Sequence, residues 1–210
     1  MSDIPMPDRM KALPFDPVKR LPVPWFVAWI DGKPEWRIAD GGKFAEATSR
    51  KACWVCGDTL GRQVAFVIGP MCTVNRIAGD PPSHRECAIY SAKVCPFLTR
   101  PAMERREDGL PDGLKEPGGV MLQHNPGVCA IWVTRSFELV GLHSGWLFNL
   151  GDPTEVLWYA AGQPANLQQV TEGLALGCLK LRPIASAESP EAEAQFDRQL
   201  EAARKWFPKP

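Results

Sequence analysis

Two short motifs constrain this chain more than any other feature. The first reads C-W-V-C-G and places Cys53 and Cys56 three residues apart, directly before Gly57. The second reads P-P-S-H-R-E-C and places His84 and Cys87 three residues apart. Zinc binds four thiolate or imidazole ligands in a tetrahedron, and a Cys-x-x-Cys turn brings two thiolates to one point. Because Gly57 can adopt the left-handed conformation that such a turn needs, we predict a zinc site with these four ligands.

The second motif also carries the signals of a helix start. Two prolines before Ser83 prevent an earlier start, and Ser83 with Glu86 matches the S-x-x-E capping box. His84 would then be the first helical residue, with the motif cysteine one turn further along the same face. We expect this helix to cover residues 83–94.

The segment between the two motifs predicts a β-hairpin. Residues 59–69 and 71–77 are rich in β-branched side chains and are separated by Gly-Pro. A Cys-x-x-Cys turn, a hairpin and a helix with the last two ligands resemble the treble-clef zinc fingers, over residues 51–98. The resemblance implies a structural zinc ion but no particular activity, because nucleases, ribosomal proteins and protein-binding domains share this unit. Cys72 and Cys95 are rivals for one ligand position, and we expect both to be core thiols.

The whole chain predicts an α+β fold in three parts. Residues 1–100 would form an N-terminal arm, a β-hairpin turning at Asp31-Gly32, a short helix over residues 42–51 capped by Asp40, and the zinc-binding unit. Residues 101–119 are rich in proline and glycine, which predicts a linker or long loop. Residues 120–210 would form an antiparallel sheet with packed helices, because several strands run together before the helices.

Turn signals and apolar periods locate the elements of this last part. The expected strands are 120–123, 129–134, 137–140, 146–150 and 156–160, and the expected helices are 167–179 and 190–207.

The composition of the chain indicates its cellular compartment and the class of partner that it can bind. The chain has 24 basic and 24 acidic residues, so no global charge favours nucleic acid. No apolar run is long enough to span a membrane, and the N-terminus lacks the apolar core of a signal peptide. An odd number of cysteines with a Cys-x-x-Cys motif is typical of a reducing compartment. We therefore expect a cytoplasmic protein without a membrane partner.

Four protein ligands close the coordination sphere, which favours structural over catalytic zinc. The sequence also contains no glycine-rich phosphate loop. We therefore hypothesise a non-enzymatic, zinc-stabilised protein that binds a macromolecular partner, a protein more readily than a nucleic acid. The candidate contact residues are four basic side chains and one exposed aromatic side chain, namely Arg62, Arg76, Arg85, Lys93 and Trp54.

Two alternatives come from other functional classes. A treble-clef (HNH-like) nuclease needs a catalytic histidine in the hairpin, which has none, so such an enzyme would have to use Asn75 and His124. A small-ligand site in the C-terminal half would be lined by aromatic side chains, namely Trp132, Trp146, Trp158 and Tyr159.

Three further stretches carry a second resemblance. V-A-F-V-I-G-P-M-C-T-V-N-R, P-P-S-H-R-E-C-A and C-P-F-L resemble an uncharacterised group of proteins from bacteria and their phages. This resemblance implies an accessory protein of a phage or mobile element, located in the cytoplasm of the bacterial host cell.

Overall fold

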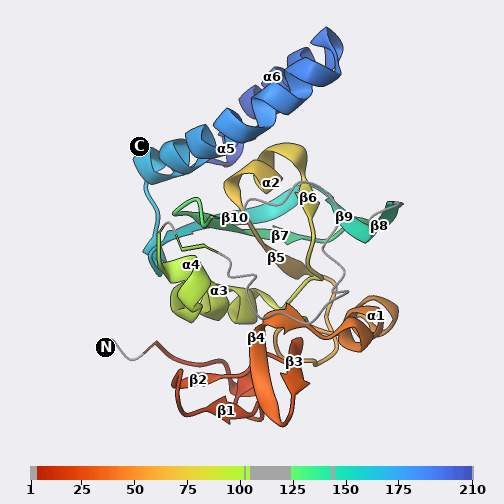
Figure 1. Ribbon diagram of the computed structural model, residues 1–210, viewed down its shortest axis with the longest axis vertical. Helices are drawn as coiled ribbons and strands as arrows, with labels where there is room; N and C mark the ends of the chain where they lie inside the picture. Colours follow the sequence, from red (N-terminus) through yellow and green to blue (C-terminus); the bar gives the residue numbers. More distant parts are fainter. Residues whose placement is uncertain (1–3, 102, 105–123, 143–144, 210) are drawn as a thin grey trace.

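A computed structural model describes residues 4–101, 103–104, 124–142 and 145–209 of the chain (Figure 1). It shows a mixed architecture of small antiparallel sheets and helices, so the predicted α+β class is confirmed. The predicted strand at 120–123 lies outside the described residues.

The N-terminal region forms two small hairpins and a helix. Asp31 and Gly32 both have positive φ angles, of 49° and 72°, which matches the predicted hairpin turn. The carboxylate of Asp40 accepts hydrogen bonds from the backbone N–H groups of Gly42 and Lys43, so the predicted helix cap is confirmed. The elements are η1 (Asp8–Met10), β1 (Phe15–Asp16), β2 (Leu21–Pro22), β3 (Val27–Ile30), β4 (Lys33–Ala39) and α1 (Gly41–Arg50).

The predicted hairpin over residues 59–77 is wrong. Only its first half is a strand, and Pro70 begins a helix instead of a return strand. Proline suits the first helical position because its fixed φ is helical and its missing N–H has no partner there. The elements of this region are β5 (Val64–Ile68), α2 (Pro70–Asn75), β6 (Ile77–Ala78), α3 (Arg85–Val94) and α4 (Pro96–Thr99).

The strand that pairs with β5 is β7, which follows the predicted linker in the sequence. The main sheet has the order β11-β10-β7-β5, and Val64 of β5 lies opposite Thr134 of β7. Three of the short strands form a second sheet, of order β6-β9-β8. The remaining elements are β7 (Cys129–Thr134), β8 (Phe137–Leu142), β9 (Gly145–Leu150), β10 (Pro153–Ala160), β11 (Gln163–Pro164), α5 (Leu167–Glu188), α6 (Pro190–Ala203) and η2 (Arg204–Trp206).

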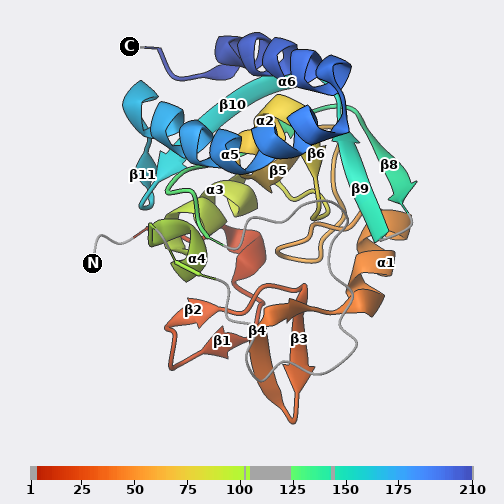
Figure 2. The ribbon, with the colours of Figure 1, turned by 45° about the horizontal axis from the view of Figure 1, so that its top comes forward.

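The core lies on both faces of β7, all six residues of which are buried. Ile131 and Val133 point towards α3, where they pack with Ala88 and Ala92. Trp132 points to the opposite face, which α2, α5 and α6 cover (Figures 1 and 2). A strand that is apolar on both faces lies at the centre of a layered core, and helices cover this one on both sides.

The helix predicted for residues 167–179 continues to Glu188. Its start has a full capping box between Asn166 and Gln169. Its second half still turns one side to the core, because Cys178, Leu181 and Ala185 pack against it. Arg182 of the same half donates a hydrogen bond to Asp197 of α6 at 2.6 Å. The following helix is capped by Ser189 and is helical to Ala203, with a 3-10 turn thereafter.

We expect Gly173→Ala to destabilise the protein although alanine favours helices. A Cβ atom at this α5 position would lie 2.4 Å from Cγ1 of the buried Val128 and 3.1 Å from the Pro126 carbonyl oxygen. Overpacking costs about 1–3 kcal/mol, which exceeds the gain of about 1 kcal/mol in helix propensity. Urea unfolding measures the difference in unfolding free energy between the variant and the wild type.

Gly41→Ala in α1, where no atom lies within 4 Å of the new Cβ, is the matched control and should not destabilise the protein. Equal effects at both positions would contradict the close packing of α5.

Candidate metal centre

The two sequence motifs meet at one point in the structure. One potential ligand atom from each of Cys53, Cys56, His84 and Cys87 lies within 4.8 Å of the other three. Cys53 and Cys87 are fully buried, and His84 is only 9% exposed. Three thiols and one imidazole are a donor set that zinc prefers, and the buried groups can surround a single ion. Among the described residues, this is the one cluster of at least three such groups.

The first pair of ligands lies on a tight backbone loop between α1 and β5. The N–H of Leu60 donates to the carbonyl oxygen of Lys51 at 2.8 Å, which closes the loop. Inside it, the N–H of Gly57 donates to the Cys53 carbonyl oxygen at 2.8 Å, and Gly57 has the predicted positive φ, of 83°. The N–H of Cys56 points at the Cys53 sulfur, 3.5 Å away, and so favours the thiolate form of Cys53.

The second pair lies at the start of α3, but one residue later than the capping-box pattern predicts. His84 is the N-cap, and α3 begins at Arg85, without a side-chain cap. Ser83 instead exchanges two backbone hydrogen bonds of 2.8 Å with Ala65, which holds it in extended conformation beside β5. Glu86 faces away from Ser83 and forms an ion pair with Arg9 at 2.8 Å. The tertiary pairing of Ser83 therefore overrides the local helix-start signal.

The surroundings of His84 indicate which ring nitrogen would bind a metal. Nδ1 lies 3.4 Å from the Cys56 sulfur, whereas Nε2 lies 3.2 Å from the Thr59 carbonyl oxygen. A histidine bound through Nδ1 keeps its proton on Nε2, which then donates to Thr59 and fixes the ring. The Arg9 guanidinium, which offers only donors, also lies 3.1 Å from Nε2, so a proton on Nε2 has to point at Thr59, and Arg9 forms its ion pair with Glu86.

The three thiols perturb one another because they are packed together. Hydrogen bonds from the Cys56 and Cys87 thiols hold the pKa of Cys53 well below its ordinary value. The bond to Cys53 raises the pKa of Cys56 to about 11, and bonds to the other two sulfurs raise the pKa of Cys87 strongly. Only one thiol can therefore ionise easily on its own. A bound divalent cation would replace the remaining protons and allow all three thiolates to coexist.

The rival cysteines do not take part in the cluster. Cys72 lies in α2, and burial raises its pKa to about 11. Cys95 lies between α3 and α4, and burial likewise raises its pKa. Both are partly buried, Cys72 packs against the core, and neither belongs to the cluster of the four predicted donors.

Trp54 is not the exposed aromatic side chain that its place between the two cysteines predicts. It is 5% exposed and stacks on Phe26 with ring centroids 5.0 Å apart, while Phe44 contacts it edge-on. The N–H of Trp25 donates to the Val55 carbonyl oxygen at 2.7 Å, so the loop of residues 51–60, called the metal loop below, packs against the segment between β2 and β3. This tertiary contact covers the indole.

The four candidate basic residues fall into two groups. Arg76 and Arg85 form ion pairs with Asp152 and Glu155, at 3.1 Å for Arg76, and Lys93 lies over the ring of Tyr159. Arg62 is exposed and has no ion pair among the described residues. Of the four candidates, Arg62 is therefore the one whose charge is available to bind an anionic ligand.

The aromatic side chains proposed for a C-terminal pocket do not line one cavity. Trp132 and Trp158 belong to the core on the α5 side of the sheet, and Tyr159 belongs to the core on the α3 side. Trp146 is 51% exposed on β9. The prediction of a shared aromatic pocket is therefore wrong, because successive residues of a strand point to opposite faces.

The residues required by the nuclease alternative do not join the metal centre. His124 pairs with Glu104 through Nδ1 at 3.3 Å, and Asn75 is the last residue of α2. Neither belongs to the cluster of metal donors.

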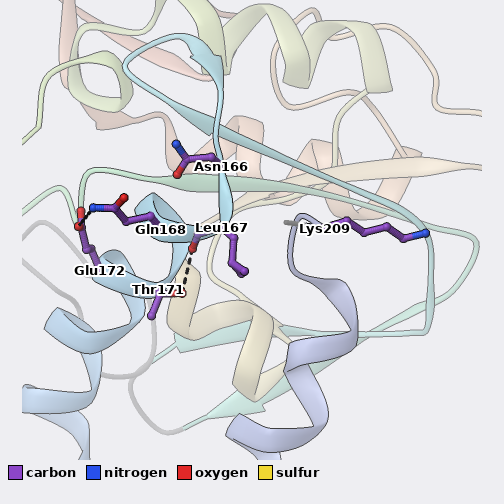
Figure 3. A pocket seen from close by; sticks show the side chains of 6 residues that line it. All are labelled: Asn166, Leu167, Gln168, Thr171, Glu172 and Lys209. Carbon is purple, nitrogen blue, oxygen red and sulfur yellow. Dashed lines mark hydrogen bonds between the residues drawn. The ribbon is translucent and has the colours of Figure 1, made fainter.

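Most polar side chains of a shallow depression at the start of α5 are hydrogen-bonded within α5 itself. Figure 3 shows that Gln168 donates to Glu172 and that the Thr171 hydroxyl donates to the Leu167 carbonyl oxygen, at 2.9 and 2.8 Å. Lys209 extends away from the Gln168–Glu172 pair in this view. Because Gln168, Glu172 and Thr171 already have hydrogen-bond partners, the depression does not point to a ligand.

Comparisons with known proteins identify no relative of this chain. No protein-family model matches the chain, and no curated protein or solved structure shows significant similarity to it. In the part of the chain that the structure describes, no helix has both the length and the apolar character needed to cross a bilayer.

Proposed function

We propose that this chain is a zinc-stabilised, non-enzymatic binding protein. The observation that carries the proposal is the convergence of four buried donors, three sulfurs and one ring nitrogen, around a single point. Four protein ligands leave no open position for substrate or water, so such a zinc ion acts structurally. It would join the loop after α1 to the start of α3 and hold both against β5.

The N-terminal arm supports a structural role for the metal. Arg9 lies beside His84 and pairs with Glu86, while Met10 is buried in the core at 2% exposure. Three thiolates and one Zn²⁺ carry a net charge of −1, which the adjacent guanidinium would offset. The metal centre thus ties together the arm, the loop and the helix.

We further propose that the partner is a protein that contacts β8. Among the described residues, β8 pairs on one side only, with β9, so its other edge keeps free backbone groups. Leu139, Val140 and Leu142 are each about 40% exposed or more, and Trp146 of β9 is 51% exposed. A long, apolar edge strand can pair with an extended segment of another chain. The motif resemblance to bacterial and phage proteins adds the proposal of a cytoplasmic accessory protein of a mobile element.

Leu142→Lys should abolish capture of this partner. A lysine beside the free edge of β8 opposes strand addition by its charge, whereas the fold loses only an exposed side chain. The experiment uses the zinc-loaded chain as bait in a bacterial lysate and identifies by mass spectrometry the proteins retained by the wild type. We expect their recovery to fall at least about tenfold in the variant.

Leu179→Lys is the matched control, because Leu179 of α5 is 74% exposed and lies outside this surface. It should retain the same proteins as the wild type. Equal recovery with Leu142→Lys, or capture that disappears after nuclease treatment, would contradict the proposed β8 interface.

A further inference from the structure

A second surface of the molecule gathers positive charge around a cavity. The cavity has a volume of about 530 Å³ and lies beside the metal loop. It is lined by the C-cap of α1, the start of β5 with the segment before it, and the turn between β7 and β8 with the start of β8, namely Lys51, Leu60, Gly61, Arg62, Val64, Arg135, Ser136 and Phe137. Three of these side chains are cationic, and none of the described lining residues is acidic.

The three cations come together only through tertiary structure. Lys51 begins the metal loop, which the hydrogen bond from Leu60 to Lys51 closes, and Arg62 lies two residues beyond its end. Arg135 follows β7, whose last residue, Thr134, lies opposite Val64. Within the described chain none of the three cations forms an ion pair, whereas Arg9, Arg76 and Arg85 each do. In a chain of zero net charge, three unpaired cations around one hollow form a distinct anion-attracting site.

The remaining walls restrict the kind of anion. Leu60, Val64 and the half-buried ring of Phe137 supply an apolar side, and the Ser136 hydroxyl can donate or accept a hydrogen bond. Cavities of this volume hold small organic ligands, and a bare inorganic ion would leave most of the space unfilled. Arginine forks match phosphate oxygens in pairs, and lysine adds a point charge.

We propose that this cavity binds a phosphate ester with an apolar or aromatic body, the size of a nucleotide unit. The phosphate lies among Lys51, Arg62 and Arg135, and the body packs against Phe137. The ligand can be a free nucleotide or one unit of a single strand of nucleic acid, since both carry this chemistry. The site is separate from the β8 surface and does not depend on the protein partner proposed above.

The test is isothermal titration calorimetry of the zinc-loaded full chain with three probes. They are adenosine diphosphate, inorganic pyrophosphate and a single-stranded 12-nucleotide oligonucleotide. We expect adenosine diphosphate or the oligonucleotide to bind at least tenfold more tightly than pyrophosphate. Tighter oligonucleotide binding that weakens steeply with salt identifies a nucleic-acid strand as the source, and tighter nucleotide binding identifies a free nucleotide. Absence of binding by all three probes, or equal affinity for pyrophosphate, overturns the proposal.

Substitutions of the three cationic residues test whether the ligand binds in this cavity. Arg62→Gln and Arg135→Gln should each weaken the tighter probe at least tenfold. Lys51→Gly should do the same while keeping the fold, because Lys51 has a positive φ of 52° that glycine adopts without strain. Arg198→Gln, an exposed arginine of α6 outside the cavity, is the matched control and should leave affinity unchanged. An equal loss in this control, or no loss in the three cavity variants, overturns the assignment.

Discussion

Cys53→Ser should release the metal and unfold the region around it. The wild-type chain is expected to contain one zinc ion, and the variant close to none, by elemental mass spectrometry of purified protein. The Cys53 sulfur accepts N–H groups from both Cys56 and His84, so its loss disturbs both ligand pairs. Structural zinc sites contribute about 10–16 kcal/mol of binding free energy, which is as large as the whole stability of a typical domain. A chelator added to the wild type should therefore produce the same loss of structure.

Cys178→Ser is the matched control for this experiment. Cys178 lies in α5, is partly buried and does not belong to the cluster, so the variant should keep its zinc and most of its stability. A wild-type protein that contains no zinc, or a Cys53→Ser variant with an unchanged unfolding curve, would contradict the structural metal centre.

Trp132→Ala should be the most damaging substitution away from the metal. Trp132 is completely buried in β7, contacts Trp206 edge-on and donates its indole N–H to the Gly151 carbonyl oxygen at 3.0 Å. Truncating a buried tryptophan costs about 3–5 kcal/mol, and the orphaned carbonyl oxygen adds to this cost. Urea unfolding followed by circular dichroism should show a lower midpoint urea concentration for the variant than for the wild type.

Trp29→Ala provides the comparison at equal side-chain size. Trp29 of β3 is 46% exposed, and surface substitutions of this kind usually change stability by less than about 1 kcal/mol. If both tryptophan variants lost similar stability, β7 would not be the centre of the core.

Local signals in the sequence account for much of the fold. The Asp31-Gly32 turn, the Asp40 helix cap and the strands 129–134 and 146–150 occur where the pattern predicts them. The prediction that Cys53, Cys56, His84 and Cys87 come together is confirmed for a related reason. Each Cys-x-x-Cys or His-x-x-Cys pair is positioned by its own turn or helix start, so the chemistry of each pair can be read from a few residues.

Other features depended on contacts between distant segments. The pattern gave β5 a hairpin partner within residues 71–77, but its partner is β7, because a strand that is apolar on both faces is stabilised at the centre of the sheet. The same kind of long-range contact buries Trp54 against Phe26 and holds Ser83 beside Ala65 instead of in a helix cap.

The sequence by itself thus determined which four side chains form the cluster and that their donor chemistry suits zinc. Only the tertiary structure decided that Cys53 and His84 meet, and that Arg62 lies with Lys51 and Arg135 around one cavity. The physical reason is the distance along the sequence over which the interactions act. Turn and cap preferences act over a few residues, whereas the pairing of β5 with β7 depends on apolar surface that the whole chain buries together.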